Sequence, residues 1–290
     1  MLLSFNTGVI CDAGYSLEEA IVMIKQAGFD AVDFSFWNYK KDLNSDEAKK
    51  DFLEFKKIAD ENGIVFNQAH APFPSRVMDD VKSAKIFENI VGAIKCASYL
   101  GVKNIVVHPV QHLKYAEADN KEKLFDMNME FYKALEPYCK EYNINVALEN
   151  MWQGNGNAPI TKIFPSTCGR PKEFIKYLDT LNSEYLVACL DIGHALLVSE
   201  DPYDFIKELG HDRLKALHIH DVDGIFDSHT LPYYGIGKWD RVAMALKEIN
   251  YDGDFTFEAG CFLDPLPKEL YLDALKYMER VGRYIVGMIK

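Results

Sequence analysis

The sequence predicts a single (β/α)8 TIM barrel on three observations. Eight short segments rich in strand-forming residues alternate with amphipathic helical stretches along the 290 residues. No linker-like stretch divides residues 1–290, so one domain of eight β/α units is expected rather than two doubly wound halves. On five of the segments, the polar residue at the end has the parity opposite to that of the large apolar residues.

The eight strands are expected where β-branched and aromatic residues gather between turn signals. They cover residues 3–10, 31–36, 64–70, 104–108, 144–149, 185–191, 214–220 and 254–258. The pairs Asn62-Gly63 and Asp252-Gly253 stand just before the third and the eighth strand, and each marks a turn from helix to strand.

The intervening helices follow from apolar residues at helical spacing, and the first is the best marked. Ser16 and Glu19 form a capping-box pair at its start, and Gly28 is a typical C-terminal stop. A second helix is expected over 81–97, closed by Gly101. Further helices are expected over residues 121–142, 171–181, 202–209, 239–249 and 268–286.

The alternation along five strands predicts which side chains enter the barrel. On the fifth strand, Ile144, Val146 and Leu148 share one parity and Glu149 has the other. If the apolar set packs against the helices, the opposite set faces the interior, because successive side chains point to opposite faces. The inward residues at the strand ends are then His108, Glu149, Asp191, His218 and Glu258, with His70 ending the third strand. Barrel enzymes carry their chemistry at this end of the strands.

Composition narrows the classes of function. With 48% hydrophobic and 26% charged residues, the chain is typical of a globular protein. No run of about 18 apolar residues is present, and residues 1–6 lack the basic start of a secretory signal, so a cytoplasmic protein without a membrane partner is expected. The net charge of −12, without a basic block, disfavours a nucleic-acid partner. Six cysteines without CxxC spacing predict buried thiols.

The inward residues predict a divalent metal ion at the mouth of the barrel. Several imidazoles and carboxylates cannot share one desolvated mouth without a countercharge. Ligands of this kind without a thiolate suit Mn²⁺, Zn²⁺, Co²⁺ or Mg²⁺, and no nucleotide cofactor is expected. Further residues of the same types follow the sixth and seventh strands, namely His194, Asp227 and His229. His220 has the parity of His218, so either histidine could be the ligand on strand seven.

Short motifs occur in order along nearly the whole chain. They are Gln68-Ala69-His70-Ala71-Pro72-Phe73, Val107-His108-Pro109, Leu148-Glu149-Asn150-Met151, Leu190-Asp191-Ile192-Gly193-His194-Ala195, His218-Ile219-His220-Asp221, Asp227-Ser228-His229, Gly235-Ile236-Gly237, Trp239-Asp240 and Phe257-Glu258. In these motifs the chain resembles the xylose-isomerase-like barrel superfamily of sugar (phosphate) isomerases and epimerases, which also includes zinc apurinic endonucleases.

The resemblance implies a metal ion held by Glu149, Asp191, His218 and Glu258, with Glu149 and Glu258 also acting as the acid/base pair. Such an enzyme removes a proton beside the carbonyl of a small sugar or sugar phosphate, which leaves an enediolate, and a second carboxylate returns the proton. The metal stabilises the anion as a Lewis acid. His194 would bind the substrate by a hydrogen bond. The superfamily also contains dehydratases, so a sugar-derivative dehydratase is a close alternative.

The same resemblance leaves a trinuclear zinc phosphodiesterase open, in which zinc-bound hydroxide attacks a phosphate. The additional zinc ligands of the apurinic endonucleases correspond to His70, His108, His194, Asp227 and His229. The segment Leu231-Pro232-Tyr233-Tyr234 departs from the endonuclease pattern, and the acidic charge balance disfavours a DNA groove. A sugar-binding barrel that keeps its metal without catalysing a reaction is the third interpretation.

The loop over 150–170 is the longest connection at the predicted active face, where long loops form lids or specificity walls. Trp152 and Phe73 could supply apolar walls against a sugar ring. Arg170 and Lys238 could bind a phosphate or could be solvated surface charges, so the phosphorylation state of the substrate stays open. Aromatic residues on the last helix permit a homodimer, namely Tyr271, Tyr277 and Tyr284.

Overall fold

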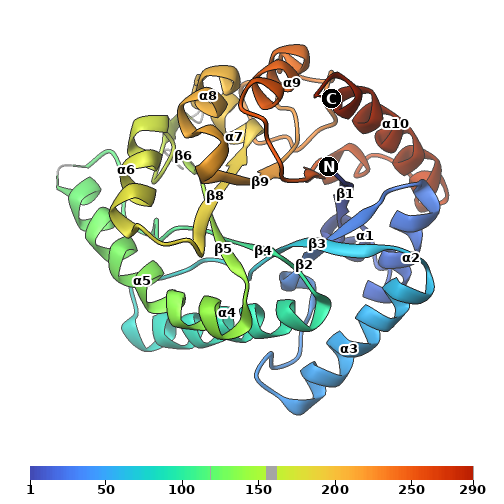
Figure 1. Cartoon of the computed structure of the whole chain (residues 1–290), viewed down its shortest axis with the longest axis horizontal. Helices are drawn as coiled ribbons and strands as arrows, with labels where there is room; N and C mark the ends of the chain where they lie inside the picture. Colours follow the sequence, from blue (N-terminus) through green and yellow to red (C-terminus); the bar gives the residue numbers. More distant parts are fainter. Residues whose placement is uncertain (118, 155–161, 290) are drawn as a thin grey trace.

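Eight parallel strands form a nearly closed ring inside a layer of helices in the computed structural model, which describes residues 1–117, 119–154 and 162–289 (Figure 1). The strands are β1 Leu3–Asn6, β2 Ala31–Ser35, β3 Val65–His70, β4 Asn104–Val107, β5 Asn145–Glu149, β8 Leu186–Asp191, β9 Leu214–His218 and β10 Phe255–Phe257. Their order in the sheet is β10-β1-β2-β3-β4-β5-β8-β9. The predicted TIM barrel is therefore confirmed.

The ring closes between β9 and β10 through a short parallel bridge. Ile219 pairs with Phe257, the Ile219 N–H donates to the Thr256 carbonyl at 2.8 Å, and the Glu258 N–H donates to the Ile219 carbonyl at 3.1 Å. The closing bonds thus fix the backbone of Glu258 next to the end of β9.

The helices surround the ring (Figure 1). They are α1 Gly8–Asp12, α2 Leu17–Ala27, α3 Asp46–Glu61, α4 Asp80–Leu100, α5 Asn120–Tyr142, α6 Pro171–Leu181, α7 Ile192–Leu197, α8 Pro202–Arg213, α9 Trp239–Glu248 and α10 Tyr271–Ile289, with 3-10 turns at Phe36–Asn38, Gly260–Phe262 and Lys268–Leu270. The capping box of α2 is confirmed, since the Ser16 hydroxyl accepts from the Glu19 N–H, and Gly28 ends the helix at φ 106°. Among the described residues, no helix has the length and apolar character needed to cross a membrane.

Several elements differ from the expectation. The first strand ends at Asn6 rather than residue 10, because the Asn6 side-chain oxygen accepts from the Gly8 N–H at 2.7 Å and turns the chain into α1. The seventh strand ends at His218 rather than residue 220. Helices α3 and α7 were not predicted. Within the loop over 150–170, β6 Trp152–Gly154 pairs with β7 Ile163–Pro165 as an antiparallel hairpin, and residues 155–161 of that predicted lid lie outside the described residues.

Two separate apolar cores confirm the parity argument. Ile105, Leu148 and Leu190 belong to the large core between the strands and the helices. A small second core inside the barrel consists of residues that share the parity of the inward strand ends, namely Val106, Ala147, Val187, Cys189 and Ala216. Inside the barrel, these apolar side chains therefore pack beneath the polar side chains that lie at the carboxyl ends of the strands.

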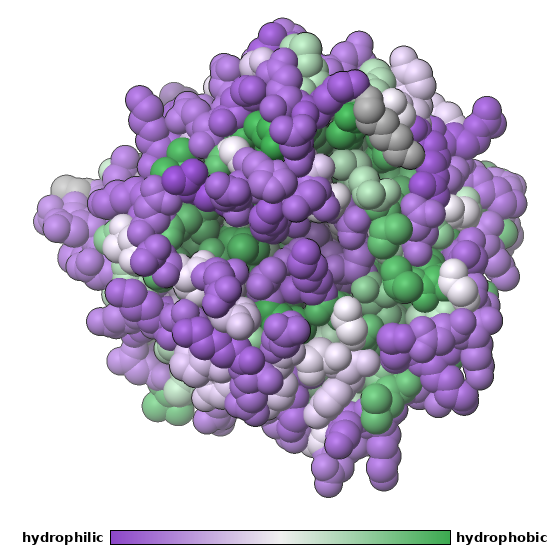
Figure 2. Space-filling model, in the orientation of Figure 1, coloured by the Kyte–Doolittle hydropathy of each residue, from purple (hydrophilic) through white to green (hydrophobic). Residues whose placement is uncertain are grey.

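The outer surface is predominantly polar on the face shown in Figure 2, where apolar side chains form smaller separate areas. Of the three tyrosines considered for a homodimer, Tyr271 is buried in the core, whereas Tyr277 and Tyr284 are exposed.

Candidate metal centre

A cavity with a volume of about 740 Å³ opens at the carboxyl ends of the strands. Its lining includes residues that end or follow five different strands, namely Asn6, His70, His108, Glu149 and Glu258. The cavity therefore lies where barrel enzymes place their reacting groups.

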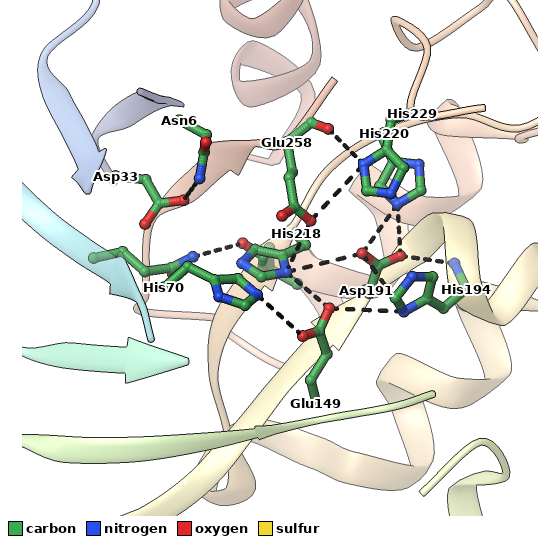
Figure 3. Close-up of polar contacts among 12 residues, drawn as sticks. Asn6, Asp33, His70, Glu149, Asp191, His194, His218, His220, His229 and Glu258 are labelled. Carbon is green, nitrogen blue, oxygen red and sulfur yellow. Dashed lines mark hydrogen bonds and ion pairs between the residues drawn. The ribbon is translucent and has the colours of Figure 1, made fainter. Parts of the chain in front are cut away.

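Four of the predicted residues meet at this end of the barrel. Ligand-type atoms of Glu149, Asp191, His218 and Glu258 lie within 4.8 Å of one another. His218 Nδ1 is 2.9 Å from Glu149 Oε1, 3.1 Å from Glu258 Oε2 and 3.9 Å from Asp191 Oδ2. Figure 3 shows Glu149 and Glu258 approaching His218 from opposite sides.

The Asn150 side chain and the start of α7 hold Asp191 in place. The Asn150 side chain accepts from the Asp191 N–H at 2.7 Å and donates to the Asp191 carbonyl at 2.9 Å. The Asp191 carboxylate in turn accepts from the His194 N–H at 2.7 Å and caps α7. One residue thus ends β8, begins α7 and presents an oxygen toward His218.

The clustered charges shift the pKa values of the group. Burial lowers the pKa of His218, but the Glu258 and Glu149 carboxylates outweigh burial and raise this pKa to about 10. Burial raises the pKa of Glu149, yet His218 and His108 hold it well below its usual value. Three carboxylates face this one imidazole, so a divalent ion bound here would compete with the His218 proton for the same ligands.

The donor set fits a divalent ion. Three carboxylates and one imidazole, without a thiolate, suit Mn²⁺, Zn²⁺, Co²⁺ or Mg²⁺. Glu149 Oε2 is buried and no hydrogen bond to it is found among the described residues, although His108 Nε2 lies 3.0 Å away as an ion-pair partner. An unsatisfied buried carboxylate oxygen is costly. Glu149, Asp191, His218 and Glu258 would therefore hold a divalent ion.

A second group adjoins the first through Glu149. His70 Nε2 lies 3.1 Å from His108 Nε2, and the two rings share the Glu149 carboxylate. His70 Nδ1 lies 2.8 Å from the Ala71 carbonyl and donates to it, which leaves Nε2 as an acceptor in the neutral ring. Two facing ring nitrogens need a proton or a cation between them, so this group also has the character of an ion site.

A third group combines His194, Asp227 and His229. The Nε2 atoms of His194 and His229 lie 3.4 and 3.2 Å from Asp227 Oδ2. Their Nδ1 atoms donate to the carbonyls of Asn150 and Glu258, each at 2.9 Å, an arrangement that also orients metal-binding histidines. Burial lowers the pKa of His229, but Asp227 and Glu258 outweigh it and raise the value to about 9. His220 lies within the same group.

Aromatic side chains wall the cavity. Phe73 stacks on the His108 ring with centroids 5.0 Å apart, and Trp37 meets Phe73 edge-on at 5.7 Å. Trp152 lines the cavity and donates from Nε1 to Asp227 Oδ2 at 3.1 Å. The two predicted wall residues, Phe73 and Trp152, thus flank the candidate metal centre.

Arg170 and Lys238 lie outside the cavity lining, and Arg170 forms an ion pair with Glu200. Among the described lining residues there is no lysine or arginine, and residues 155–161 contain none either. The lining instead carries five carboxylates, namely Asp12, Glu149, Asp227, Glu258 and Asp264. The described part of the cavity is therefore acidic.

Comparison with known protein families matches residues 21–281 to the family described as the xylose isomerase-like TIM barrel. The chain belongs to this family. The resemblance drawn from the sequence motifs is thereby confirmed.

Two relatives of this xylose isomerase-like barrel are similar to it in sequence, and their names indicate different things. The uncharacterised protein y4fM of Sinorhizobium fredii is 24% identical over 267 residues, which cover 83% of this chain and 80% of the relative. The probable endonuclease 4 of Bacillus licheniformis is 29% identical over 191 residues, which cover 61% of this chain and 59% of the relative.

Solved structures share the fold of this xylose isomerase-like barrel over its whole length. A D-tagatose 3-epimerase-like protein superposes with a TM-score of 0.77 at 22% identity, covering 100% of this chain and 98% of its own. IOLI protein with a binding zinc atom superposes with a TM-score of 0.75 at 18% identity, again covering 100% and 98%. At these identities the likeness shows a common fold.

In this xylose isomerase-like barrel, residues of the first two strands complete the site and were missed by sequence reasoning. Asn6 lines the cavity and donates to the buried Asp33 carboxylate at 2.6 Å, while its oxygen accepts from the Ser35 hydroxyl. Burial raises the pKa of Asp33. The alternation of Val32 and Phe34 with Asp33 and Ser35 was the available signal, because it has the period of an inward polar set.

Proposed function

We propose that this protein is a divalent-metal-dependent isomerase or epimerase that acts on a small sugar through an enediolate intermediate. The observation that carries the proposal is the meeting of Glu149, Asp191, His218 and Glu258 within 4.8 Å at the mouth of the barrel. Membership of the xylose isomerase-like family supports it. So does the fold shared with a D-tagatose 3-epimerase-like protein and with a zinc-binding protein.

The placement of the two glutamates suits proton transfer. Glu149 ends β5 and Glu258 follows β10, and they approach His218 from opposite sides (Figure 3). One carboxylate would take the proton from the carbon beside the carbonyl, and the other would return a proton to the opposite face or to the neighbouring carbon. A divalent ion held by the four residues would supply Lewis-acid stabilisation of the negative charge that develops on the substrate oxygens.

The cavity suits a small polyhydroxylated molecule. Its volume of about 740 Å³ lies within the usual range for small-molecule sites. The faces of Trp37, Phe73 and Trp152 would pack against the carbon-bound hydrogens of a sugar. His194, between Asn150 and Asp227, would reach a substrate hydroxyl.

Hydrogen exchange tests the proposal. Metal-loaded protein would be incubated with a panel of pentuloses and hexuloses in D2O, and NMR would detect deuterium at the carbon beside the carbonyl. We expect exchange that EDTA abolishes and that returns when the ion is restored. No exchange across the panel, with metal bound, would overturn the proposal. Loss of water from a sugar derivative would appear in the same spectra and would identify the dehydratase alternative.

A second candidate function, a zinc-dependent phosphodiesterase acting at abasic sites, is favoured by the two further groups of histidines. His70 and His108 with Glu149, and His194 and His229 with Asp227, would complete a trinuclear site, and one relative is named a probable endonuclease 4. The acidic lining disfavours a DNA backbone. Three tightly held zinc ions per chain, with EDTA-sensitive cleavage of an abasic duplex, would establish this function in place of the first.

A further inference from the structure

His220 touches two of the ligand groups at once. The residue is fully buried, and its Nε2 lies 2.9 Å from Asp191 Oδ1 and 3.0 Å from Asp191 Oδ2. Its ring stacks on His229 with centroids 3.9 Å apart and planes 6° apart. Figure 3 shows Asp191 lying between His218 and the stacked pair of His220 and His229.

The bond to Asp191 adds a second restraint to a carboxylate whose last torsion is intrinsically broad. Asp191 Oδ1 also accepts from the His194 N–H at 2.7 Å, and Oδ2 faces His218 Nδ1 at 3.9 Å. A second donor therefore holds the carboxylate with one oxygen toward the candidate metal centre. Donors of this kind orient ligand carboxylates and raise the affinity for the ion.

Gly193 makes room for the His220 ring. A Cβ atom at position 193 would lie 2.0 Å from Cε1 and 2.4 Å from Nδ1 of His220. Any side chain there would displace the imidazole, because the distances lie far inside van der Waals contact. The segment 191–194 thus supplies both the carboxylate that His220 binds and the space that His220 occupies.

The face of the His220 ring that points away from Gly193 contacts the third ligand group. His229, on which His220 stacks, points Nε2 at Asp227 and donates from Nδ1 to the Glu258 carbonyl. His220 Nδ1 lies 3.4 Å from the Asp221 carbonyl, at the long limit of a hydrogen bond. The ring is therefore held by Asp191 and His229, and it fits because position 193 carries no side chain.

We infer that His220 is a positioning residue that orients Asp191 for the divalent ion and couples the metal centre to the His194–Asp227–His229 group. The inference rests on the proposed function, because the centre is the one assigned to the proposed enzyme. The role differs from that of a ligand, since Nε2 is directed at Asp191.

Metal binding by His220 variants tests the inference. Mn²⁺ would be titrated into chelator-stripped protein by calorimetry, with bound metal counted by mass spectrometry. In His220→Ala we expect a Kd about 10- to 100-fold weaker, as for lost outer-shell partners elsewhere, with an unchanged number of ions. His220→Gln keeps an N–H donor at a similar reach and should restore most of the affinity. His211→Ala is the control, because His211 is partly exposed on α8 and bonds to the Asn250 carbonyl.

With His220→Ala, two outcomes would overturn the inference. An unchanged Kd in His220→Ala would remove the positioning role, and loss of one bound ion with an unchanged Kd for the remainder would make His220 a ligand. Gly193→Ala provides an independent test if His220→Ala does not fold, because it moves the ring without removing it. It should weaken Mn²⁺ binding, and an unchanged Kd there would equally contradict the inference. These titrations contain no sugar, so they test the role of His220 in metal binding. A failure to turn over sugar would contradict the proposed activity and would leave the inference about His220 unaffected.

Discussion

His218 Nδ1 lies 2.9 Å from Glu149 Oε1, although the two residues end strands that are not neighbours in the sheet. β8 stands between β5 and β9, so the contact crosses the barrel interior rather than following a strand pair. Only inward side chains can meet in this way. This contact between Glu149 and His218 therefore lies within the candidate metal centre, together with Asp191 and Glu258.

Asp191→Asn should weaken binding of the divalent ion and keep the fold. Asparagine caps a helix as well as aspartate does, so α7 should persist, while a ligand charge is lost. We expect an affinity loss of at least about tenfold, measured by calorimetry on stripped protein. Asp179→Asn is the matched control, because Asp179 is an exposed partner of Arg213. Equal affinities in the two variants would count against Asp191 as a ligand.

Glu258→Gln should abolish proton exchange while sugar binding survives. The amide cannot accept the carbon-bound proton, so we expect deuterium incorporation to fall by at least about 10²-fold at saturating metal. Binding can be followed by the fluorescence of Trp37 and Trp152, which line the cavity. Glu248→Gln, at a surface pair with Lys207, is the control. A Glu258→Gln enzyme that still exchanges deuterium at the parent rate would refute the acid/base role.

The stability of metal-free protein should fall as the pH rises. The pKa of His218 is raised from 6.5 to about 10, so its stabilising contribution is complete below about pH 6.5 and is lost as the pH rises toward 10. A divalent ion competes with that proton, so ion binding should instead strengthen over this range. Thermal melts at several pH values, with EDTA or with Mn²⁺, check both slopes. Parallel slopes would mean that the ion does not bind at His218.

Phe73→Ala should raise KM with little effect on kcat or stability. The side chain is 53% exposed and stacks on His108 at the cavity wall. If the Phe73 ring contributes about 1 kcal/mol to substrate binding by packing against the sugar, its loss corresponds to a KM about fivefold higher. Phe226→Ala is a suitable control, because Phe226 is 61% exposed and lies outside the cavity lining. The same KM change in both variants would argue against a wall at Phe73.

A neutral ketose should bind at least as well as its phosphate ester. Proteins recognise phosphate chiefly through Arg and Lys, and the described lining of the cavity has five carboxylates and neither cation. Competition experiments that follow tryptophan fluorescence would compare the two ligands. Tighter binding of the phosphate ester would show that bound metal ions, rather than side chains, supply the anion site.

Parity was the most informative signal in the sequence. The alternation around Glu149 and Asp191 predicted their inward direction before any contact between strands was known, because the period of a strand requires no tertiary information. The same alternation occurs around Asp33, where it also indicates an inward side chain. Helix α3 has a comparable signal, because Ala48, Phe52, Phe55 and Ala59 recur at helical spacing and are buried.

Other features depend on contacts that local patterns do not contain. The pairing of Arg170 with Glu200 joins residues 30 apart in the chain, so composition alone left Arg170 as a candidate for binding phosphate. His218 and His220 have the same parity, and only their neighbours across the barrel separate them: His218 faces Glu149 and Glu258, whereas His220 faces Asp191 and His229. Sequence spacing cannot distinguish these roles, because both side chains point inward.

Anomalous diffraction from crystals soaked in Mn²⁺ tests the central claim most directly. The account predicts a strong anomalous peak within bonding distance of Glu149, Asp191, His218 and Glu258. Data that showed these four side chains well ordered, with manganese present in the crystal but no anomalous peak among them, would contradict it.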